Sequence, residues 1–170
     1  GDWISEAGNH TLTINGVNSY SMTVNYTIEA RASYLSNNAV YDNYININES
    51  NASMIKIDSS SYILGDNYTQ IGNHTVTLYG VGGYFKSYQI TIEPKFIEVI
   101  DGGEYTGSVD VSFDANGMTY LNGKLQTSNI VRETGYHTLL VVGEYGYSKI
   151  INFTVHPNLS TVNFDNLYYG

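Results

Sequence analysis

The sequence predicts an all-β chain in which small β-sandwiches of about 63–64 residues follow one another in tandem. One stretch occurs three times. It opens with a glycine and, two residues later, a histidine, at positions 8 and 10, 72 and 74, and 135 and 137. Apolar residues follow at every second position, which is the pattern of a half-buried strand. The spacing between copies, 64 and then 63 residues, therefore indicates several small domains rather than one large one.

The composition favours the same fold class and argues against several partners. The chain of 170 residues has 17 tyrosines and no cysteine. Aromatic packing, not disulfides, must therefore stabilise repeats that are near the lower size limit of an independent core. A net charge of −9 argues against nucleic acid, whose binding depends on Lys and Arg, and against anionic lipid. No apolar run approaches the roughly 20 residues of a membrane span, so none is expected in this fragment.

Residues 1–30 are predicted to be the C-terminal part of a repeat. Apolar and polar side chains alternate between residues 12 and 28, on both sides of a glycine-containing turn at 15–19, and this pattern predicts a β-hairpin. An isolated hairpin is only marginally stable in water. We therefore expect it to pack on a neighbouring repeat or another molecule, with Trp3 and Ile4 at its buried edge.

Two whole repeats are predicted at 31–94 and 95–157, and residues 158–170 are predicted to begin a further one. Pro94 and Pro157 each follow an apolar strand pattern. Because proline has no backbone N–H to donate, it is typical of the end of a strand, so these two prolines mark the boundaries between repeats.

The alternation predicts about six short strands in each whole repeat. In the second whole repeat, Asn122 and Gly123 lie between two apolar runs, which is a strong signal for a tight hairpin. A weaker turn at 58–61 is its counterpart one repeat earlier. The closing hairpin covers 137–155. Two sheets packed face to face, about 10 Å apart, would bury the apolar faces of such strands.

Several stretches of this chain resemble the small Ig-like repeats that occur in tandem on prokaryotic surface proteins and secreted enzymes. The stretches are Gly102–Tyr105, Tyr120–Lys124, Gly135–Leu139 and Phe153–Val155. The resemblance implies an Ig-like β-sandwich, an extracellular or cell-surface location, and a spacer or adhesion role without catalysis. The chain departs from the family at the three repeated histidines, where related repeats often carry tyrosine.

Twelve repeated positions are predicted to be structural. Repeats that stack end to end keep equivalent residues far apart, so the three histidines should not share a metal ion. Each is instead expected to bond nearby backbone, as a tyrosine hydroxyl does at the corner of Ig sandwiches. The twelve positions are Gly8, His10, Gly16, Tyr20, Gly72, His74, Gly80, Tyr84, Gly135, His137, Gly143 and Tyr147.

Two further groups are candidates for ligand binding. Tyr79, Tyr136 and Tyr145 fall on outward or loop positions where rings could stack on sugars, although tyrosine is equally typical of strands. The best calcium candidates are the three carboxylates Glu98, Asp101 and Glu104. The other repeats lack these carboxylates, so a solvated acidic loop is expected there, and neither a metal nor a cofactor is predicted.

The sequence does not predict an enzyme. It has no cysteine, no Gly-x-Ser-x-Gly turn and no His-Glu-x-x-His helix. The favoured function is a stalk, spacer or adhesin segment of a surface protein. A module that binds glycans or host proteins is the alternative, as is an accessory region of a secreted polysaccharide-degrading enzyme. Open strand edges in the partial repeats would also allow chains to associate with one another.

Overall fold

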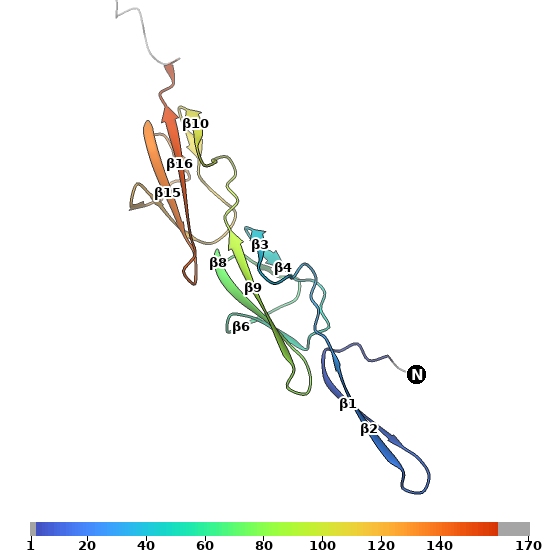
Figure 1. Ribbon diagram of the computed structural model, residues 1–170. Helices are drawn as coiled ribbons and strands as arrows, with labels where there is room; N and C mark the ends of the chain where they lie inside the picture. The colour runs from blue at the N-terminus through green and yellow to red at the C-terminus, as the bar shows by residue number, and fades with distance from the viewer. Residues whose placement is uncertain (1–2, 160–170) are drawn as a thin grey trace, which may run out of the picture.

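The computed structural model describes residues 3–159, and all its regular elements in that range are β-strands. Figure 1 shows an elongated molecule in which groups of strands follow one another along the long axis. Within the described range, no helix has the length and apolar character needed to cross a membrane. The all-β prediction is confirmed.

A hairpin forms one end of the molecule (Figure 1). Its strands are β1 (Gly8–Asn15) and β2 (Ser21–Ile28), paired antiparallel and joined by the predicted turn. Leu12 is 49% exposed and Val24 36% exposed, because no second sheet of the described chain covers the hairpin. The prediction of a buried edge at Trp3 and Ile4 is wrong: they are 98% and 55% exposed.

The middle block contains seven strands. They form a five-stranded sheet in the order β3-β9-β8-β5-β6 and a two-stranded sheet β4-β7. Residues of both sheets, such as Ile45 and Leu78, share one buried cluster, so the sheets pack face to face as a sandwich. The strands are β3 (Ala39–Asp42), β4 (Ile45–Asn46), β5 (Met54–Ile57), β6 (Ser60–Tyr62), β7 (Asn67–Tyr68), β8 (Gly72–Tyr79) and β9 (Phe85–Glu93).

The C-terminal block repeats this topology. Its five-stranded sheet has the order β10-β16-β15-β12-β13, and its two-stranded sheet is β11-β14. Val109 and Val131 of the small sheet pack with Leu139 and Phe153 of the large one. The strands are β10 (Gly103–Thr106), β11 (Val109–Asp110), β12 (Met118–Leu121), β13 (Lys124–Leu125), β14 (Ile130–Val131), β15 (Gly135–Val142) and β16 (Ser148–His156).

Each block therefore has seven strands, one more than predicted. The additional pairing is parallel: β3 lies beside β9, and β10 lies beside β16. The first strand of each block thus forms one edge of the large sheet, next to the last strand of that block. The local sequence does not predict this pairing. Alternation of apolar residues reports burial within one strand, whereas these two strands are far apart in sequence and meet only when the sandwich is closed.

Local sequence accounts for the hairpins inside the blocks. The β5–β6 turn contains Asp58 with φ 55°, and the β12–β13 turn contains Asn122 with φ 50°. Asp and Asn tolerate this left-handed conformation better than most residues. β9 and β16 end directly before Pro94 and Pro157. The repeat boundaries themselves remain predictions, and residues 160–170 of the predicted last repeat lie outside the described part.

The apolar core continues from one block to the next. Ala7 and Ala30, at the base of the N-terminal hairpin, belong to the buried cluster of the middle block, as does Val141 of β15. Phe96, in the connection between the blocks, contacts Phe113 edge-to-face at 5.5 Å and packs against both clusters. Neighbouring parts of the molecule are thus joined by buried apolar contact as well as by the chain.

Candidate functional site

The three repeated histidines make the same hydrogen bond. In each, Nε2 lies close to the carbonyl oxygen four residues earlier, at 2.8 Å for His10, 2.9 Å for His74 and 2.7 Å for His137. A carbonyl oxygen only accepts, so Nε2 carries a proton in all three. His74 and His137 are buried, and His10 is half-buried. The histidines lie on different strands, β1, β8 and β15.

A hairpin turn of the middle block docks on the base of the N-terminal hairpin. The turn between β8 and β9 places Val81 beside Gly8 in a parallel bridge. The Val81 N–H donates to the Ala7 carbonyl at 3.0 Å, and the Asn9 N–H donates to the Val81 carbonyl at 3.0 Å. The Asn9 side-chain amide donates to the Gly82 carbonyl at 3.2 Å. We call this contact the first junction.

The second junction repeats this arrangement between the middle and C-terminal blocks. Here the turn between β15 and β16 places Glu144 beside Gly72. The Glu144 N–H donates to the Ile71 carbonyl at 2.7 Å, and the Asn73 N–H donates to the Glu144 carbonyl at 3.2 Å. The Asn73 side-chain amide donates to the Tyr145 carbonyl at 3.4 Å. Two successive junctions therefore have the same hydrogen bonds.

Close approach of backbones at the junctions accounts for four of the repeated glycines. A Cβ on Gly8 would lie 2.4 Å from a backbone nitrogen of the docked turn, and one on Gly72 would lie 2.7 Å from the equivalent nitrogen. A Cβ on Gly80 or Gly143 would lie 2.4 Å from a backbone oxygen of the preceding part. These distances are shorter than any van der Waals contact, so a side chain would separate the two parts.

Polar side chains bind across the first junction. The Tyr84 hydroxyl accepts a hydrogen bond from the Ala30 N–H and donates one to the Glu29 carboxylate, both at 3.0 Å. Lys86 Nζ lies 3.4 Å from the same carboxylate. The hydrogen bond from Tyr84, followed by the Lys86 ammonium, lowers the pKa of Glu29. The carboxylate therefore stays ionised in its position across the junction.

The second junction has the same three residue types one repeat later. Lys149 Nζ lies 3.9 Å from the Glu93 carboxylate, and both side chains are about one-third exposed. Tyr147 is half-buried beside the middle block. Burial, and then the charge of Glu93, raises the pKa of Tyr147 to about 12. Two repeated tyrosines predicted to be structural, Tyr84 and Tyr147, thus lie at junctions, whereas Tyr20 is exposed at the hairpin tip.

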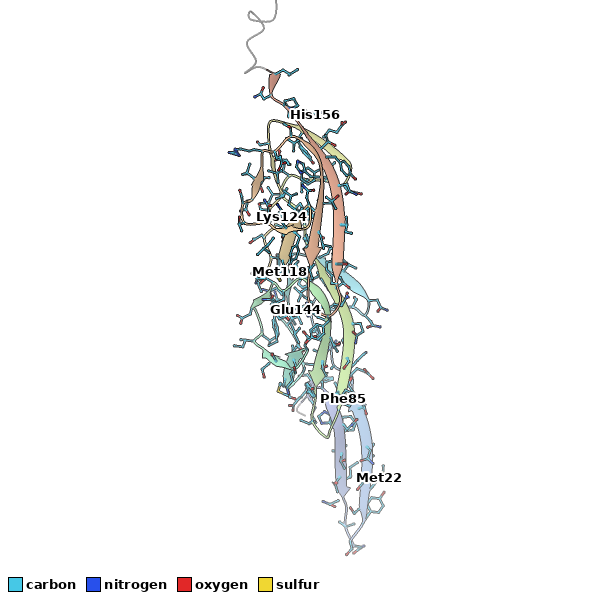
Figure 2. All side chains as sticks on the ribbon, turned by 90° about the vertical axis from the view of Figure 1, so that its left-hand side faces the viewer. Met22, Phe85, Met118, Lys124, Glu144 and His156 are labelled. Carbon is cyan, nitrogen blue, oxygen red and sulfur yellow. The ribbon has the colours of Figure 1, made fainter. Side chains whose placement is uncertain are left out.

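A group of potential metal ligands also lies at the second junction, which Figure 2 locates through Glu144. His74 Nδ1 is 2.9 Å from Asp58 Oδ2 and 4.0 Å from Glu144 Oε2. One ligand atom from each of the three residues lies within 4.8 Å of the others, and within residues 3–159 this is the only such group of three. Tyr68 and Tyr145 contact the His74 ring edge-to-face. Burial, followed by the charges of Asp58 and Glu144, raises the pKa of Tyr68.

The structure separates the three tyrosines that were predicted as possible sugar contacts. Tyr136 and Tyr145 are exposed, at 68% and 64%, whereas Tyr79 is half-buried beside Lys56. Tyr145 lies at the second junction, and Tyr136 pairs with Thr154 in the sheet of the C-terminal block. They do not form one platform.

The three predicted calcium ligands bind different partners. Glu98 accepts a hydrogen bond from the Asp110 N–H at 2.9 Å, and Asp101 accepts one from the Asn152 N–H at 2.8 Å. Glu104 lies 3.1 Å from Nε2 of His156. Each carboxylate therefore has a partner in its own surroundings, and the three do not form a compact ligand group.

A repeated tyrosine also forms hydrogen bonds with nearby backbone, and the sequence did not lead us to predict it. The Tyr41 hydroxyl donates to the Tyr34 carbonyl and accepts from the Ser36 N–H. One repeat later, the Tyr105 hydroxyl accepts from the Ile100 N–H at 2.8 Å. Burial raises the pKa of Tyr41. The signal in the sequence was the 64-residue spacing of Tyr41 and Tyr105.

An open pocket lies on the middle block at the β3–β4 connection. Three tyrosines, several asparagines and two opposite charges line it, which is a combination suited to hydroxyl-rich ligands. Tyr34 and Tyr44 are 76% and 48% exposed, so their rings are accessible. The lining residues are Tyr34, Tyr41, Asp42, Asn43, Tyr44, Ile45, Asn46, Asn48, Asn67 and Lys95. None of the tyrosines predicted from the sequence as sugar contacts lines this pocket.

Comparison with known proteins finds similar structures but no family. No protein-family model matches the chain, and a search of curated proteins finds no match. One similar solved structure is the Bacteroides ovatus mixed-linkage glucan utilization locus SGBP-B in complex with a mixed-linkage heptasaccharide, at 11% identity and a TM-score of 0.34, covering 89% of this chain and 54% of that one. Another is the insect immune protein hemolin, at 15% identity and a TM-score of 0.24, covering 88% and 56%. The chain spans about half the length of these two proteins, and neither likeness assigns it to a family.

Proposed function

We propose that this chain is a non-catalytic, rod-like segment of an extracellular or cell-surface protein, in which it acts as a stalk, spacer or adhesin. The observation that carries the proposal is the repeated junction. Two successive junctions have the same backbone hydrogen bonds, the same side-chain amide bond from Asn9 or Asn73, and the same Glu–Lys pair.

Such junctions fix the angle between neighbouring parts. A flexible linker would allow the parts to move independently, whereas here a turn of one part is hydrogen-bonded into the next and buried apolar residues cross the contact. Equal junctions give equal rotations between successive parts, as in other repeat proteins. A segment built in this way extends a chain by a constant step, which is the mechanical requirement for a stalk.

Small-angle X-ray scattering of the chain tests this proposal. We expect the scattering curve to match that of a single extended rod, with a maximum dimension several times the cross-section. A matched chain in which residues 94–97 are replaced by a Gly/Ser linker and Gly72 by alanine should give a broader distribution of dimensions, because the two changes remove Phe96 from between the two cores and displace the docked turn. A compact particle, or wild-type dimensions as broad as those of the linker variant, would contradict the proposal.

Binding of a carbohydrate is the second candidate, favoured by the pocket at the β3–β4 connection. Exposed Tyr44 and Tyr34 offer rings for stacking, and amides with Lys95 offer partners for sugar hydroxyls. A glycan array with wild type and Tyr44→Ala tests it. Binding that is lost in this variant but retained in Tyr136→Ala supports the pocket. Loss only in Tyr136→Ala or Tyr145→Ala would instead favour the contacts predicted from sequence.

A further inference from the structure

The hydrogen bonds of His74 leave two acceptors facing each other. Nε2 carries its proton toward the Gln70 carbonyl, 2.9 Å away. In a neutral imidazole, Nδ1 is then a lone pair. That lone pair faces Asp58 Oδ2 at 2.9 Å, and Glu144 Oε2 is 4.0 Å away. One imidazole nitrogen and two carboxylate oxygens thus converge within 4.8 Å of one another, and a cation between them would bind all three.

At the equivalent site in the C-terminal block, both ring nitrogens of the histidine have hydrogen-bond partners and no cation is required. His137 donates through Nε2 to the Glu133 carbonyl at 2.7 Å, and the side-chain amide of Asn122 lies 3.0 Å from Nδ1. The amide donates and the imidazole accepts, so the pair is satisfied in its neutral form. Asp58 occupies the position of Asn122, and it replaces that donor with a carboxylate.

A second substitution between the repeats adds the second carboxylate, which is the third ligand of the group. At the first junction the turn residue beside the preceding block is Val81, and at the second it is Glu144. The two residues make the same backbone hydrogen bonds, so the exchange leaves the docking unchanged. Its effect is to direct a half-exposed carboxylate from the C-terminal block toward His74 of the middle block.

We propose that Asp58, His74 and Glu144 bind a divalent transition-metal cation, with Zn²⁺ as the preferred ion, and that the ion links the middle block to the C-terminal block. One imidazole nitrogen and two carboxylate oxygens are typical zinc ligands, and water can complete the coordination. Calcium and magnesium prefer sites made only of oxygen.

The surroundings of the three ligands have the properties of a metal site. The bond from His74 to the Gln70 carbonyl fixes the ring and directs Nδ1 toward the carboxylates, which is the usual support for a metal-bound histidine. The Thr75 N–H donates to the second oxygen of Asp58 at 3.1 Å and so orients that carboxylate. Glu144 is 50% exposed and can rotate to close the remaining distance. An open pocket lined by Asp58, Asn73 and Tyr145, among others, lies beside the site and exposes Asp58 to solvent.

Isothermal titration of the chelator-treated chain with ZnCl₂ tests the proposal. We expect one ion per chain, with CaCl₂ and MgCl₂ unable to compete. Two variants copy residues that the other repeat carries at the same positions: Asp58→Asn copies Asn122, and Glu144→Val copies Val81. Both should fold, and each should weaken zinc binding by at least about 10–100-fold, because loss of a ligand costs no less than loss of a group that only supports one.

NMR of the imidazole nitrogens locates the ion. Zinc should shift the His74 signals and leave those of His137 unchanged. His156, which lies beside Glu104, is the alternative zinc ligand outside the junction, so His156→Ala should retain binding. The proposal is wrong if wild type binds zinc no more tightly than Asp58→Asn, or if zinc shifts His156 and leaves His74 unchanged. Neither result bears on the stalk function, which depends on the shape of the chain.

Discussion

At the scale of single residues, one side-chain type occupies three different environments. His137 has a partner on each ring nitrogen and is 2% exposed, His74 faces two carboxylates, and half-buried His10 stacks on Tyr26 at 5.2 Å. The hydrogen bond to the carbonyl four residues earlier is common to all three. The energetic role of each histidine therefore depends on its burial and on its second partner.

Replacement of His137 by alanine should lower stability without removing a ligand contact. The change removes the hydrogen bonds that His137 makes with the Glu133 carbonyl and the Asn122 amide, and it opens a cavity beside Phe153. We expect a loss of about 3 kcal/mol in the free energy of unfolding, or roughly 10 °C in Tm. His10→Ala is the control and should cost under about 1 kcal/mol, because water replaces its exposed contact. An unchanged Tm for His137→Ala in differential scanning calorimetry would contradict the structural role.

Tyr147 should make the second junction sensitive to alkali. Its pKa is raised from 10.0 to about 12 by burial and then by Glu93, so the neutral phenol is favoured in the folded chain. The resulting stability is present below pH 10 and is lost as the pH rises through about 12. Denaturant midpoints measured between pH 9 and pH 12 should therefore fall less steeply in Tyr147→Phe than in wild type. Equal slopes would show that Tyr147 ionises freely while folded.

At the scale of elements, the same hairpin has different degrees of support along the chain. β1–β2 and β8–β9 have equivalent registers, with His10 opposite Tyr26 and His74 opposite Ile90. In the middle block the hairpin is part of a five-stranded sheet covered by a second sheet. Within residues 3–159, β1 and β2 form a sheet of two strands, with one further bridge from Gly8 to Val81. The two hairpins therefore share their internal register and differ in burial and in the neighbouring strands that pair with them.

The N-terminal hairpin should therefore open more readily than its counterpart. Leu12 and Ile14 are 49% and 45% exposed, whereas Val76 and Leu78 at the equivalent positions are fully buried. We expect amide hydrogens of β1–β2 to exchange at least about tenfold faster than those of β8–β9. Hydrogen exchange followed by mass spectrometry compares peptides of the two hairpins within one sample. Equal protection would indicate that another molecule covers the N-terminal hairpin in solution.

At the scale of the whole molecule, the junctions determine the shape. Substitution of Gly72 is the most direct way to disturb one, because a Cβ there would meet the backbone of the docked turn 2.7 Å away. Gly135 is the matched control. Its φ of 122° also favours glycine, but a Cβ there would have no neighbour within 4 Å. Gly72→Ala combines a clash with strain, and Gly135→Ala has strain alone.

We therefore expect Gly72→Ala to loosen the rod and Gly135→Ala to preserve it. Both should be destabilised by roughly 1–3 kcal/mol of backbone strain. Only Gly72→Ala should also broaden the distribution of dimensions in small-angle scattering, because only that residue lies in a junction. The same broadening in both variants would mean that the turn between β15 and β16 does not hold the two blocks together.

Self-association is a further prediction for the whole molecule. The turn at the tip of β1–β2 has the same Gly16 and Tyr20 as the two turns that dock at junctions, and Gly135 begins a strand as Gly8 and Gly72 do. We expect this tip to contact the Gly135 edge of a second chain. Sedimentation velocity over a range of concentrations should then detect association that is lost when Gly16 is replaced by a bulky residue. A single monomeric species at all concentrations would contradict this expectation.

The sequence by itself determined the all-β fold, the hairpins and the three equivalent positions of histidine and glycine. These features follow from local rules: alternation reports which face of a strand is buried, and turn residues such as Asn122–Gly123 report where the chain reverses. Even the exchanges of Asn122 for Asp58 and Val81 for Glu144 between repeats can be read from the printed sequence.

Only the tertiary structure decided what those residues meet. The parallel pairing of β3 with β9, the exposure of the N-terminal hairpin, and the convergence of Asp58 and Glu144 on His74 all join segments that are far apart in sequence. The physical reason is that alternation encodes burial within one strand, whereas these contacts depend on how one block docks on the next. The glycines were visible as a pattern, and the close backbone approach that requires them appeared only with the junction.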